Sequence, residues 1–530
     1  MGVNQVLRLS MAPPLTLLCK TSYSSHRKEA FADAKAMVIP MKHFSLILAA
    51  LLIGAAAVSC GDSSAKTDQK DTAVNTGDTN AADTAAEEEN FDPFAGLPDK
   101  DYGGYDFRML IRPYDRWIKD MYVEEATGDA VDDAVFERNS MVSEKYNVVF
   151  SCQQSSDMNY EMDAVKSILA NEDAYDLIIP HARAGIAYAN QKLLLDWKTE
   201  LPYVNLKNEW WDQDAQKSLS INDKLYVMTG DISHCSMGAA NLMLFNKKLF
   251  ESLDMEYPYQ LVKDGKWTYD VWAAMVKDAA ADLDGNGVME KDHDRYGYVT
   301  QRWIGPVQAF ATSGLRVLQK DKDDIPYISF MSDKTQDVFT WYFDIIDSDY
   351  AFLDTGDLSY TGDFITIFNE GRSLFADMNM YNVFDLRSMD ADFGIVPWPK
   401  YDESSEYCTN VDAGTNICIV PMTASDPERT SIILESLCAI GSKKVIPAYF
   451  DVALQTKVSR DNDSAEMLNI IKAARIYDLG YYNKDASGEL GDEFTSFVGN
   501  KDRNLASFYE KRVKNAQKSL DKVLKAYLED

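Results

Sequence analysis

The sequence predicts an α/β protein with two or more lobes, and three observations support this prediction. The chain has 530 residues, which is more than one hydrophobic core accommodates. Strand-like and helix-like patterns alternate along the chain from about residue 105. With 46% hydrophobic and 12% aromatic residues, the chain also has enough apolar material for packed interiors.

The first elements expected in the body lie between residues 105 and 179. Apolar residues alternate over 105–112, which is the period of a strand. Segment 131–146 places its apolar residues on one helical face, and a short strand is expected at 148–152. A second helix over 160–170 leads to the apolar run 176–179, which is typical of a buried parallel strand.

Later segments repeat this alternation, without a sequence repeat of fixed period. The chain closes with a charged amphipathic helix, which is typical of a surface helix. The expected segments are a strand and helix over 242–250, a helix that starts in the tryptophan-rich stretch 267–272, a strand within 392–399, a strand at 417–421, a helix at 428–440 and the C-terminal helix at 504–530.

Segment 41–59 has the layout of a secretory signal peptide, with a basic residue, an apolar run and small residues before Cys60. Its ending, Ala-Val-Ser-Cys, resembles a bacterial lipobox, which implies that Cys60 is lipidated and becomes the first mature residue. The alternative is an uncleaved membrane helix, but the apolar run falls short of the ~20 residues that cross a bilayer. We interpret residues 1–40 as an upstream start-site artefact.

Residues 60–98 are rich in Ser, Thr, Asp, Asn and Ala, so we predict a disordered tether there. A lipid-anchored body on such a tether is expected at the extracytoplasmic face of the cell membrane. The formal charge of -31 disfavours nucleic acid as a partner. The chain has seven cysteines, without a CxxC pair, and only five histidines, which disfavours zinc chemistry. The cysteine pattern predicts no particular disulfide.

The segment Gly265–Trp272, GKWTYDVW, followed by AAMVKDAAADLDGNG, resembles family 1 extracellular solute-binding proteins. Further similarity, to a clostridial-type group of large lipoproteins, extends over about 97–485 through stretches such as LPDKDYGGYDFRMLIR and YDLIIPHAR. The resemblance implies a class II periplasmic-binding-protein fold, with two α/β lobes joined by crossover strands and a ligand cleft between them. The implied division gives 99–235 and 412–445 to the first lobe, and 236–411 and 446–530 to the second.

The same resemblance implies a function. It predicts a monomeric binding protein that captures a small solute, a sugar or oligosaccharide, and delivers it to the membrane subunits of an ABC importer. It implies no enzyme activity and no required cofactor. Two alternatives remain open: a binder of peptides or another non-sugar solute, and an exported glycoside hydrolase, whose carboxylates have no short motif. No G-x-S-x-G, H-E-x-x-H or P-loop motif is present.

Sugar binding needs flat apolar ring faces beside planar polar groups. For each candidate aromatic, ordinary core packing is the alternative interpretation. We assign Trp267 and Trp398 to packing. The candidate ligand-binding residues are Trp211, Trp303, Asn379, Tyr381, His181, Arg183 and Asp231.

Segment 282–294 has the spacing of a calcium-binding loop, with oxygen ligands at positions 1, 3, 5 and 9, a glycine at position 6 and a backbone carbonyl at position 7. Position 12 is His293, which departs from the pattern, although aspartates flank it. A structural calcium site and a polar turn therefore both remain open. The candidate ligands are Asp282, Asp284, Asn286, Val288 and Glu290.

Overall fold

The structure is a computed structural model that describes residues 91–153, 160–356, 362–386, 389–455 and 462–529. The predicted signal peptide, Cys60 and the tether up to residue 90 lie outside this part of the chain. No helix in the described ranges is long and apolar enough to span a membrane.

The first sheet has three parallel strands in the order β2-β1-β3. The predicted succession of strand, helix, strand, helix, strand over 105–179 is confirmed, with one additional short helix, α2, after the first strand. The elements are β1 (Tyr105–Ile111), α2 (Asp115–Lys119), α3 (Ala130–Tyr146), β2 (Val148–Gln153), α4 (Tyr160–Leu169) and β3 (Leu177–Ile179).

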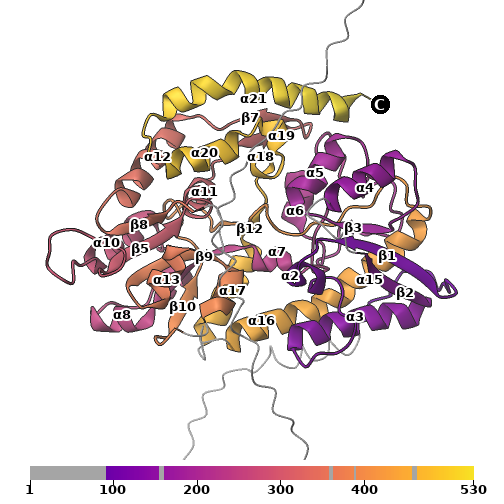
Figure 1. Cartoon of the computed structure of the whole chain (residues 1–530), viewed down its shortest axis with the longest axis horizontal. Helices are drawn as coiled ribbons and strands as arrows, with labels where there is room; N and C mark the ends of the chain where they lie inside the picture. The colour runs from indigo at the N-terminus through magenta and orange to yellow at the C-terminus, as the bar shows by residue number, and fades with distance from the viewer. Residues whose placement is uncertain (1–90, 154–159, 357–361, 387–388, 456–461, 530) are drawn as a thin grey trace, which may run out of the picture. The chain divides into compact units, whose positions relative to one another are not determined.

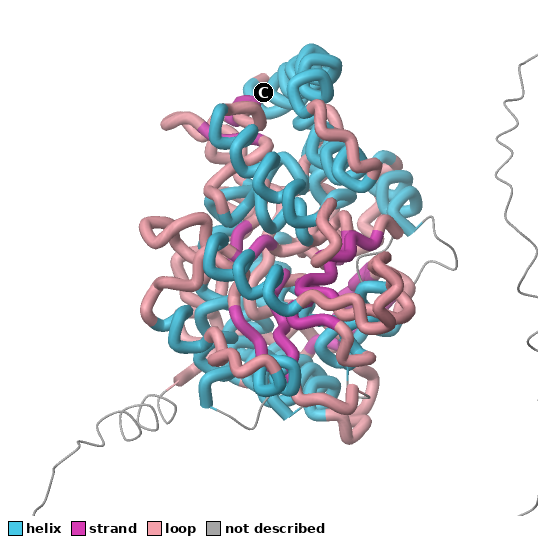
Figure 2. The backbone as a smooth tube through the Cα atoms, turned by 90° about the vertical axis from the view of Figure 1, so that its left-hand side faces the viewer, coloured by secondary structure: helices cyan, strands magenta, loops and turns pink. Residues whose placement is uncertain are grey.

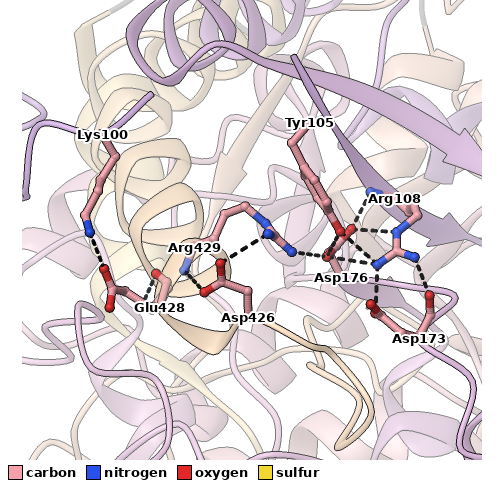
Figure 3. A network of polar contacts seen from close by, with 9 residues as sticks. Lys100, Tyr105, Arg108, Asp173, Asp176, Asp426, Glu428 and Arg429 are labelled. Carbon is pink, nitrogen blue, oxygen red and sulfur yellow. Dashed lines mark hydrogen bonds and ion pairs between the residues drawn. The ribbon is translucent and has the colours of Figure 1, made fainter. Parts of the chain in front are cut away.

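One buried carboxylate ties this sheet together. Asp176, directly before β3, accepts hydrogen bonds from the Tyr105 hydroxyl at 2.9 Å and from Nε of Arg108 at 3.0 Å. Arg429 approaches the same carboxylate at 3.2 Å, and Arg108 also pairs with Asp173 at 2.8 Å. Figure 3 shows these side chains meeting around Asp176. A buried charge is costly unless it is paired and hydrogen-bonded, so the two arginines offset the cost of burying the Asp176 carboxylate.

The second sheet has five strands in the order β10-β4-β9-β5-β8. Strand β5 runs parallel to β8 and β9, whereas β4 runs antiparallel to β9 and β10. The strands are β4 (Asn241–Asn246), β5 (Tyr296–Gln301), β8 (Ala351–Asp354), β9 (Ser373–Asn379) and β10 (Phe393–Val396).

Helices surround both sheets, and Figure 2 shows the strands lying between helical segments. Helix α21 packs on α5, α19, α20 and β7, and α16 packs on α3 and α15 (Figure 1). Two further sheets have two strands each, β6-β7 and β11-β12. The remaining helices are α5 (Ala182–Asn190), α6 (Gln213–Leu219), α7 (Cys235–Gly238), α8 (Lys247–Ser252), α9 (Tyr259–Lys263), α10 (Tyr269–Ala279), α11 (Gly305–Thr312), α12 (Asp333–Ile346), α13 (Asp363–Asn369), α14 (Met380–Asp385), α15 (Pro427–Lys443), α16 (Val445–Gln455), α17 (Asn462–Ala473), α18 (Leu479–Tyr482), α19 (Lys484–Ser487), α20 (Leu490–Gly499) and α21 (Leu505–Leu528). The short strands are β6 (Leu318–Lys320), β7 (Pro326–Ile328), β11 (Thr409–Asn410) and β12 (Arg475–Ile476).

Segment 417–421 differs from its prediction as a strand. It forms isolated bridges to three partners, from Cys418 to Met228, from Ile419 to Ile178 and from Pro421 to Leu194. Because each bridge is isolated, no continuous ladder forms. The segment therefore links the first sheet to the stretch around Met228 instead of extending one sheet.

The end of the predicted tether is packed against the body. The ring of Phe91 lies 6.1 Å from that of Trp210, and the ring of Phe94 lies 5.8 Å from that of Tyr146, both edge to face. The prediction of a disordered tether is therefore wrong for residues 91–98, because their aromatic side chains bury enough apolar surface to offset the entropy of ordering.

The tryptophans assigned to packing lie in the core around the second sheet. Trp267 and Trp398 are completely buried. The indole N–H of Trp267 donates to the carbonyl of Pro397 at 2.9 Å, and that of Trp398 donates to the Asp377 carboxylate at 3.2 Å. Both side chains therefore serve packing, as predicted.

Candidate functional site

Ligand sites of α/β sheets lie at the carboxyl ends of parallel strands. In the first sheet, β1 ends directly before Arg112, and His181 follows β3 after one proline. In the second sheet, β9 ends at Asn379, with Tyr381 in the helix that follows, and Trp303 follows β5. Side chains from both sheets are thus available at strand ends.

An aromatic pair joins these strand ends. Trp117 of α2 and Tyr381 of α14 meet edge to face, with ring centroids 5.6 Å apart. The guanidinium of Arg112 lies 4.0 Å from the centre of the Trp117 ring, and that of Arg116 lies 4.6 Å from the centre of the Tyr381 ring. The Tyr381 hydroxyl donates to the carbonyl of Cys235 at 2.7 Å, which fixes the ring.

Arg112 also contacts the segment that returns to the first sheet. Its Nη1 donates to the carbonyl of Gly414 at 2.8 Å and to Oδ1 of Asn416 at 3.4 Å. Within the same segment, the backbone N–H of Gly414 donates to the partly buried carboxylate of Asp412 at 2.6 Å. A Cβ at Gly414 would lie 2.7 Å from that carboxylate, so a side chain there would displace the Asp412 carboxylate.

His181 and Arg183 begin helix α5. Nδ1 of His181 accepts the backbone N–H of Arg183 at 3.2 Å. Burial and the nearby charges of Arg112, Arg183 and Lys484 lower the pKa of His181 to about 3, so the ring is neutral at physiological pH. The guanidinium of Arg183 pairs with Asp492 of α20 at 2.7 Å. We call the residues brought together here the interlobe cluster: Arg112, Trp117, His181, Arg183, Tyr381 and Asp412.

Beneath this cluster, the completely buried Asp120 fixes helix α2. Its carboxylate accepts the Ser233 hydroxyl at 2.6 Å, the Cys235 backbone N–H at 3.1 Å and the Asn416 side-chain amide at 2.9 Å. Nδ1 of His234 lies 3.0 Å away, and burial lowers the pKa of this imidazole. Asp120 thereby ties α2, which carries Trp117, to the segments at 233–235 and 416.

Four predicted ligand residues lie outside the interlobe cluster, and two of them, Trp211 and Asp231, are buried. Trp211 has no exposed surface, its ring packs edge to face on Trp197 at 5.5 Å, and its indole N–H donates to Glu435 at 2.7 Å. Asp231 is 7% exposed and lies 3.6 Å from Nζ of Lys472. Burial raises the pKa of the Asp231 carboxyl. Both side chains are satisfied within the protein, which favours a structural role.

Asn379 and Trp303 lie at strand ends. In the described part of the chain, neither side chain forms a hydrogen bond or ring contact with a residue of the interlobe cluster. The Asn379 amide donates to Oδ1 of Asn241 at 2.5 Å, and the residue caps the helix that carries Tyr381. The Trp303 ring lies under the guanidinium of Arg302, 4.6 Å from ring centre to Cζ. Its buried indole N–H has no hydrogen-bond partner in the described part of the chain.

Arg112, Trp117, Asp120 and Asp412 were missed from the sequence. For Arg112 a signal existed, because the residue is the last of the predicted strand segment 105–112 and lies at its carboxyl end. Trp117 lies in a five-residue helix, which is too short to show a periodicity. The partners of Asp120 are distant in sequence, so their convergence requires the fold.

The predicted calcium loop brings three carboxylates together. Asp282, Asp284 and Asp294 each place an oxygen within 4.8 Å of the others, so Asp294 converges where the pattern has His293 at position 12. The Asp282 carboxylate accepts backbone N–H groups at 2.7 Å, and that of Asp294 accepts those of Leu283 and Glu290. These bonds are those of a polar turn, and the convergence of acids also fits a cation.

Two α/β sheets, crossing segments between them and a cluster from the strand ends of both define the fold of periplasmic solute-binding proteins. No family model matches the chain, and no curated protein matches its sequence. Solved structures match the fold. A cyclo/maltodextrin-binding protein complexed with maltotetraose has a TM-score of 0.52 at 14% identity, over 80% of this chain and 96% of that one.

Two other solved structures give similar values. An ABC substrate-binding protein from Listeria monocytogenes in complex with cycloalternan has a TM-score of 0.50 at 13% identity, over 80% of this chain and 99% of that one. A sugar transporter from Rhizobium etli, in an open conformation, has a TM-score of 0.52 at 12% identity, over 80% and 100%. The predicted periplasmic-binding-protein fold is thus confirmed.

Proposed function

We propose that this chain is a solute-binding protein of the family 1 type, which captures a saccharide and delivers it to the membrane subunits of an ABC importer. The observation that carries the proposal is the interlobe cluster, in which residues after β1 and β3 of one sheet meet Tyr381 after β9 of the other. A solute bound there would touch both halves of the protein.

The chemistry of the cluster supports a saccharide. Trp117 is partly exposed and offers aromatic surface to the C–H face of a sugar ring, and the buried Tyr381 packs against it and holds it in place. Arg112, Arg183 and Asp412 offer planar groups that hydrogen-bond to hydroxyls. Maltotetraose and cycloalternan, the ligands of two proteins with the same fold, are oligosaccharides, which supports this class of solute.

Binding would act through closure. A solute that contacts residues from both sheets stabilises the arrangement in which they face each other, and the importer then recognises that arrangement. The protein is proposed to act as a monomer, without a required cofactor and without catalysis. Calcium at the 282–294 loop is proposed as a structural ion that takes no part in solute binding.

The protein is further proposed to be held at the extracytoplasmic face of the cell membrane by lipid on Cys60, with residues 61–90 as the tether. Metabolic labelling with a radioactive fatty acid tests this proposal. Label on the wild-type chain and its loss in Cys60→Ala would support the anchor. Equal labelling of both chains would exclude it.

Thermal-shift measurements on the full-length chain test the main function, because a ligand that binds only the native state raises the melting temperature. The panel contains oligosaccharides, amino acids and peptides, and each positive compound is re-isolated and analysed for cleavage. A shift with an intact saccharide supports the proposal. A shift with peptides alone favours the non-sugar binder, and saccharide cleavage favours a glycoside hydrolase.

A further inference from the structure

Cations gather at the interlobe cluster of an otherwise strongly acidic protein. The chain has a formal charge of -31. Yet Arg112 and Arg116 lie over the Trp117 and Tyr381 rings, and Arg183 begins helix α5. Against this overall charge, the cluster is a local concentration of guanidinium groups.

Carboxylates lie near these cations, but none of them pairs with Arg112. Arg183 pairs with Asp492 at 2.7 Å. Asp412 faces Arg112 and Arg183, but burial raises the pKa of its carboxyl, which opposes its charge. Asp120 reaches Arg112 only through the Asn416 amide, which bonds to both. For Arg112, no carboxylate lies within ion-pair distance in the part of the chain that the structure describes, and its hydrogen bonds to Gly414 and Asn416 come from Nη1.

The same cations act on His181. Burial lowers the pKa of this imidazole most, and the charges of Arg112, Arg183 and Lys484 lower it further. Unlike burial, these positive charges also favour a negative charge placed nearby. The acidic remainder of the protein opposes this only at short range, because salt screens charges beyond about 8 Å at physiological ionic strength.

We propose that the solute is an anionic oligosaccharide, and that Arg112 binds its carboxylate or sulfate group beside the Trp117 ring. This inference rests on the saccharide-binding function proposed above. A guanidinium has five N–H donors in a planar fork that matches an oxyanion in two bonds, and only its Nη1 side is engaged with Gly414 and Asn416. The ring beneath it offers the adjoining surface for the sugar itself.

The purely structural alternative is that Arg112 only ties β1 to the returning segment. A lysine or a neutral amide donates to a carbonyl equally well, so that role does not need a guanidinium. It also leaves unexplained why Arg112 has no carboxylate partner among the residues that the structure describes, on a chain as acidic as this one.

The test is calorimetry on the full-length chain with two matched pairs of probes. One pair is trigalacturonate and its full methyl ester, which share a skeleton and differ in charge. The other is a sulfated carrageenan tetrasaccharide and its desulfated form. We expect one anionic probe to bind at least about tenfold more tightly than its neutral partner, with affinity that falls as salt is added.

Arg112→Gln should abolish that preference, and Arg112→Lys should retain part of it. Lys322→Gln, which removes a charge from a side chain that is 86% exposed, is the control and should change nothing. The melting temperature of each unliganded variant shows whether it folds. The pair that responds identifies carboxylate or sulfate as the recognised group.

Neutral partners that bind as tightly as the anions, or an Arg112→Gln variant that keeps the preference while folded, would overturn the anionic class and leave saccharide binding intact. Absence of binding by all four probes, together with a peptide response in the thermal-shift panel, would overturn both proposals.

Discussion

Trp117 and Tyr381 meet edge to face at 5.6 Å, although one lies in the helix after β1 of the first sheet and the other follows β9 of the second. Such a ring pair contributes about 0.5–1.5 kcal/mol beyond the area it buries. The contact therefore connects the two sheets at the place where their strand ends meet. Cations over both rings make it the most distinctive part of the interlobe cluster.

Replacing Tyr381 by alanine should weaken solute binding by at least about tenfold, because an aromatic anchor at the centre of a site carries much of the binding energy. Tyr381→Phe is the matched control: it keeps the ring and loses only the bond to the Cys235 carbonyl. Its affinity should stay close to that of the wild type in calorimetry. An equal loss in both variants would assign the effect to the hydroxyl.

Asp120→Ala should destabilise the protein by about 3–5 kcal/mol, because it leaves buried donors on Ser233 and Asn416 without their acceptor. Solute affinity should fall as well, since α2 loses its anchor. Asp115→Ala removes an exposed carboxylate from the same helix and should change neither quantity. Urea unfolding and calorimetry measure the two effects, and an unchanged unfolding midpoint for Asp120→Ala would contradict this role.

The fold was accessible from the sequence because its elements carry the period of their class. Five of the first six elements were found from apolar spacing, and the long helices α3, α15 and α21 were placed within a few residues. Segment 417–421 was mistaken for a strand because its apolar run looks like one. Pairing with three different partners through isolated bridges is a tertiary property that the run itself does not encode.

Part of the site was accessible from the sequence. His181 and Arg183 were found because they follow a strand, and Tyr381 was found as an aromatic ring beside a polar residue. The structure brings these residues into one cluster with Arg112 and Trp117. The sequence did not reveal which way a ring faces. An exposed binding tryptophan and a core tryptophan have the same local sequence, so only tertiary packing separates them.

Trp211 illustrates that difference and allows a direct test. Trp211→Ala should cost about 3–5 kcal/mol of stability, because it empties a fully buried site and leaves Glu435 short of a donor. Solute affinity should be unchanged at temperatures where the variant is folded. Trp211→Phe should lose less stability, since the ring remains. A normal melting temperature with reduced affinity would instead indicate that Trp211 contacts the solute.

Asp377 should make stability depend on pH. Burial raises the pKa of its carboxyl to about 7, whereas an unfolded aspartate titrates near about 3.9. The stabilisation from the protonated form is complete below the unfolded pKa and is lost as pH rises through about 7. Relative to Asp377→Asn, the wild type should lose about 2–3 kcal/mol between pH 5 and pH 8.

Asparagine is a suitable reference for Asp377 because its single carbonyl oxygen still accepts the Tyr298 hydroxyl and the Trp398 indole N–H, which both approach Oδ2. Urea unfolding of both chains at the two pH values provides the measurement. A constant difference in unfolding midpoint between them would contradict the raised pKa.

Calcium should raise the melting temperature of the full-length chain if the 282–294 loop holds the ion, because binding to the native state alone adds RT ln(1 + [L]/Kd) to stability. EDTA should reverse the shift, and Asp284→Asn should abolish it, since the change removes the charge while the amide oxygen still accepts the Asn286 backbone N–H of the turn. Asp321→Asn, in another acidic turn, should keep the response. If calcium does not change the melting temperature, the loop is a polar turn without an ion. The backbone hydrogen bonds from Leu283 and Glu290 to Asp294 would then explain why the acidic side chains lie together.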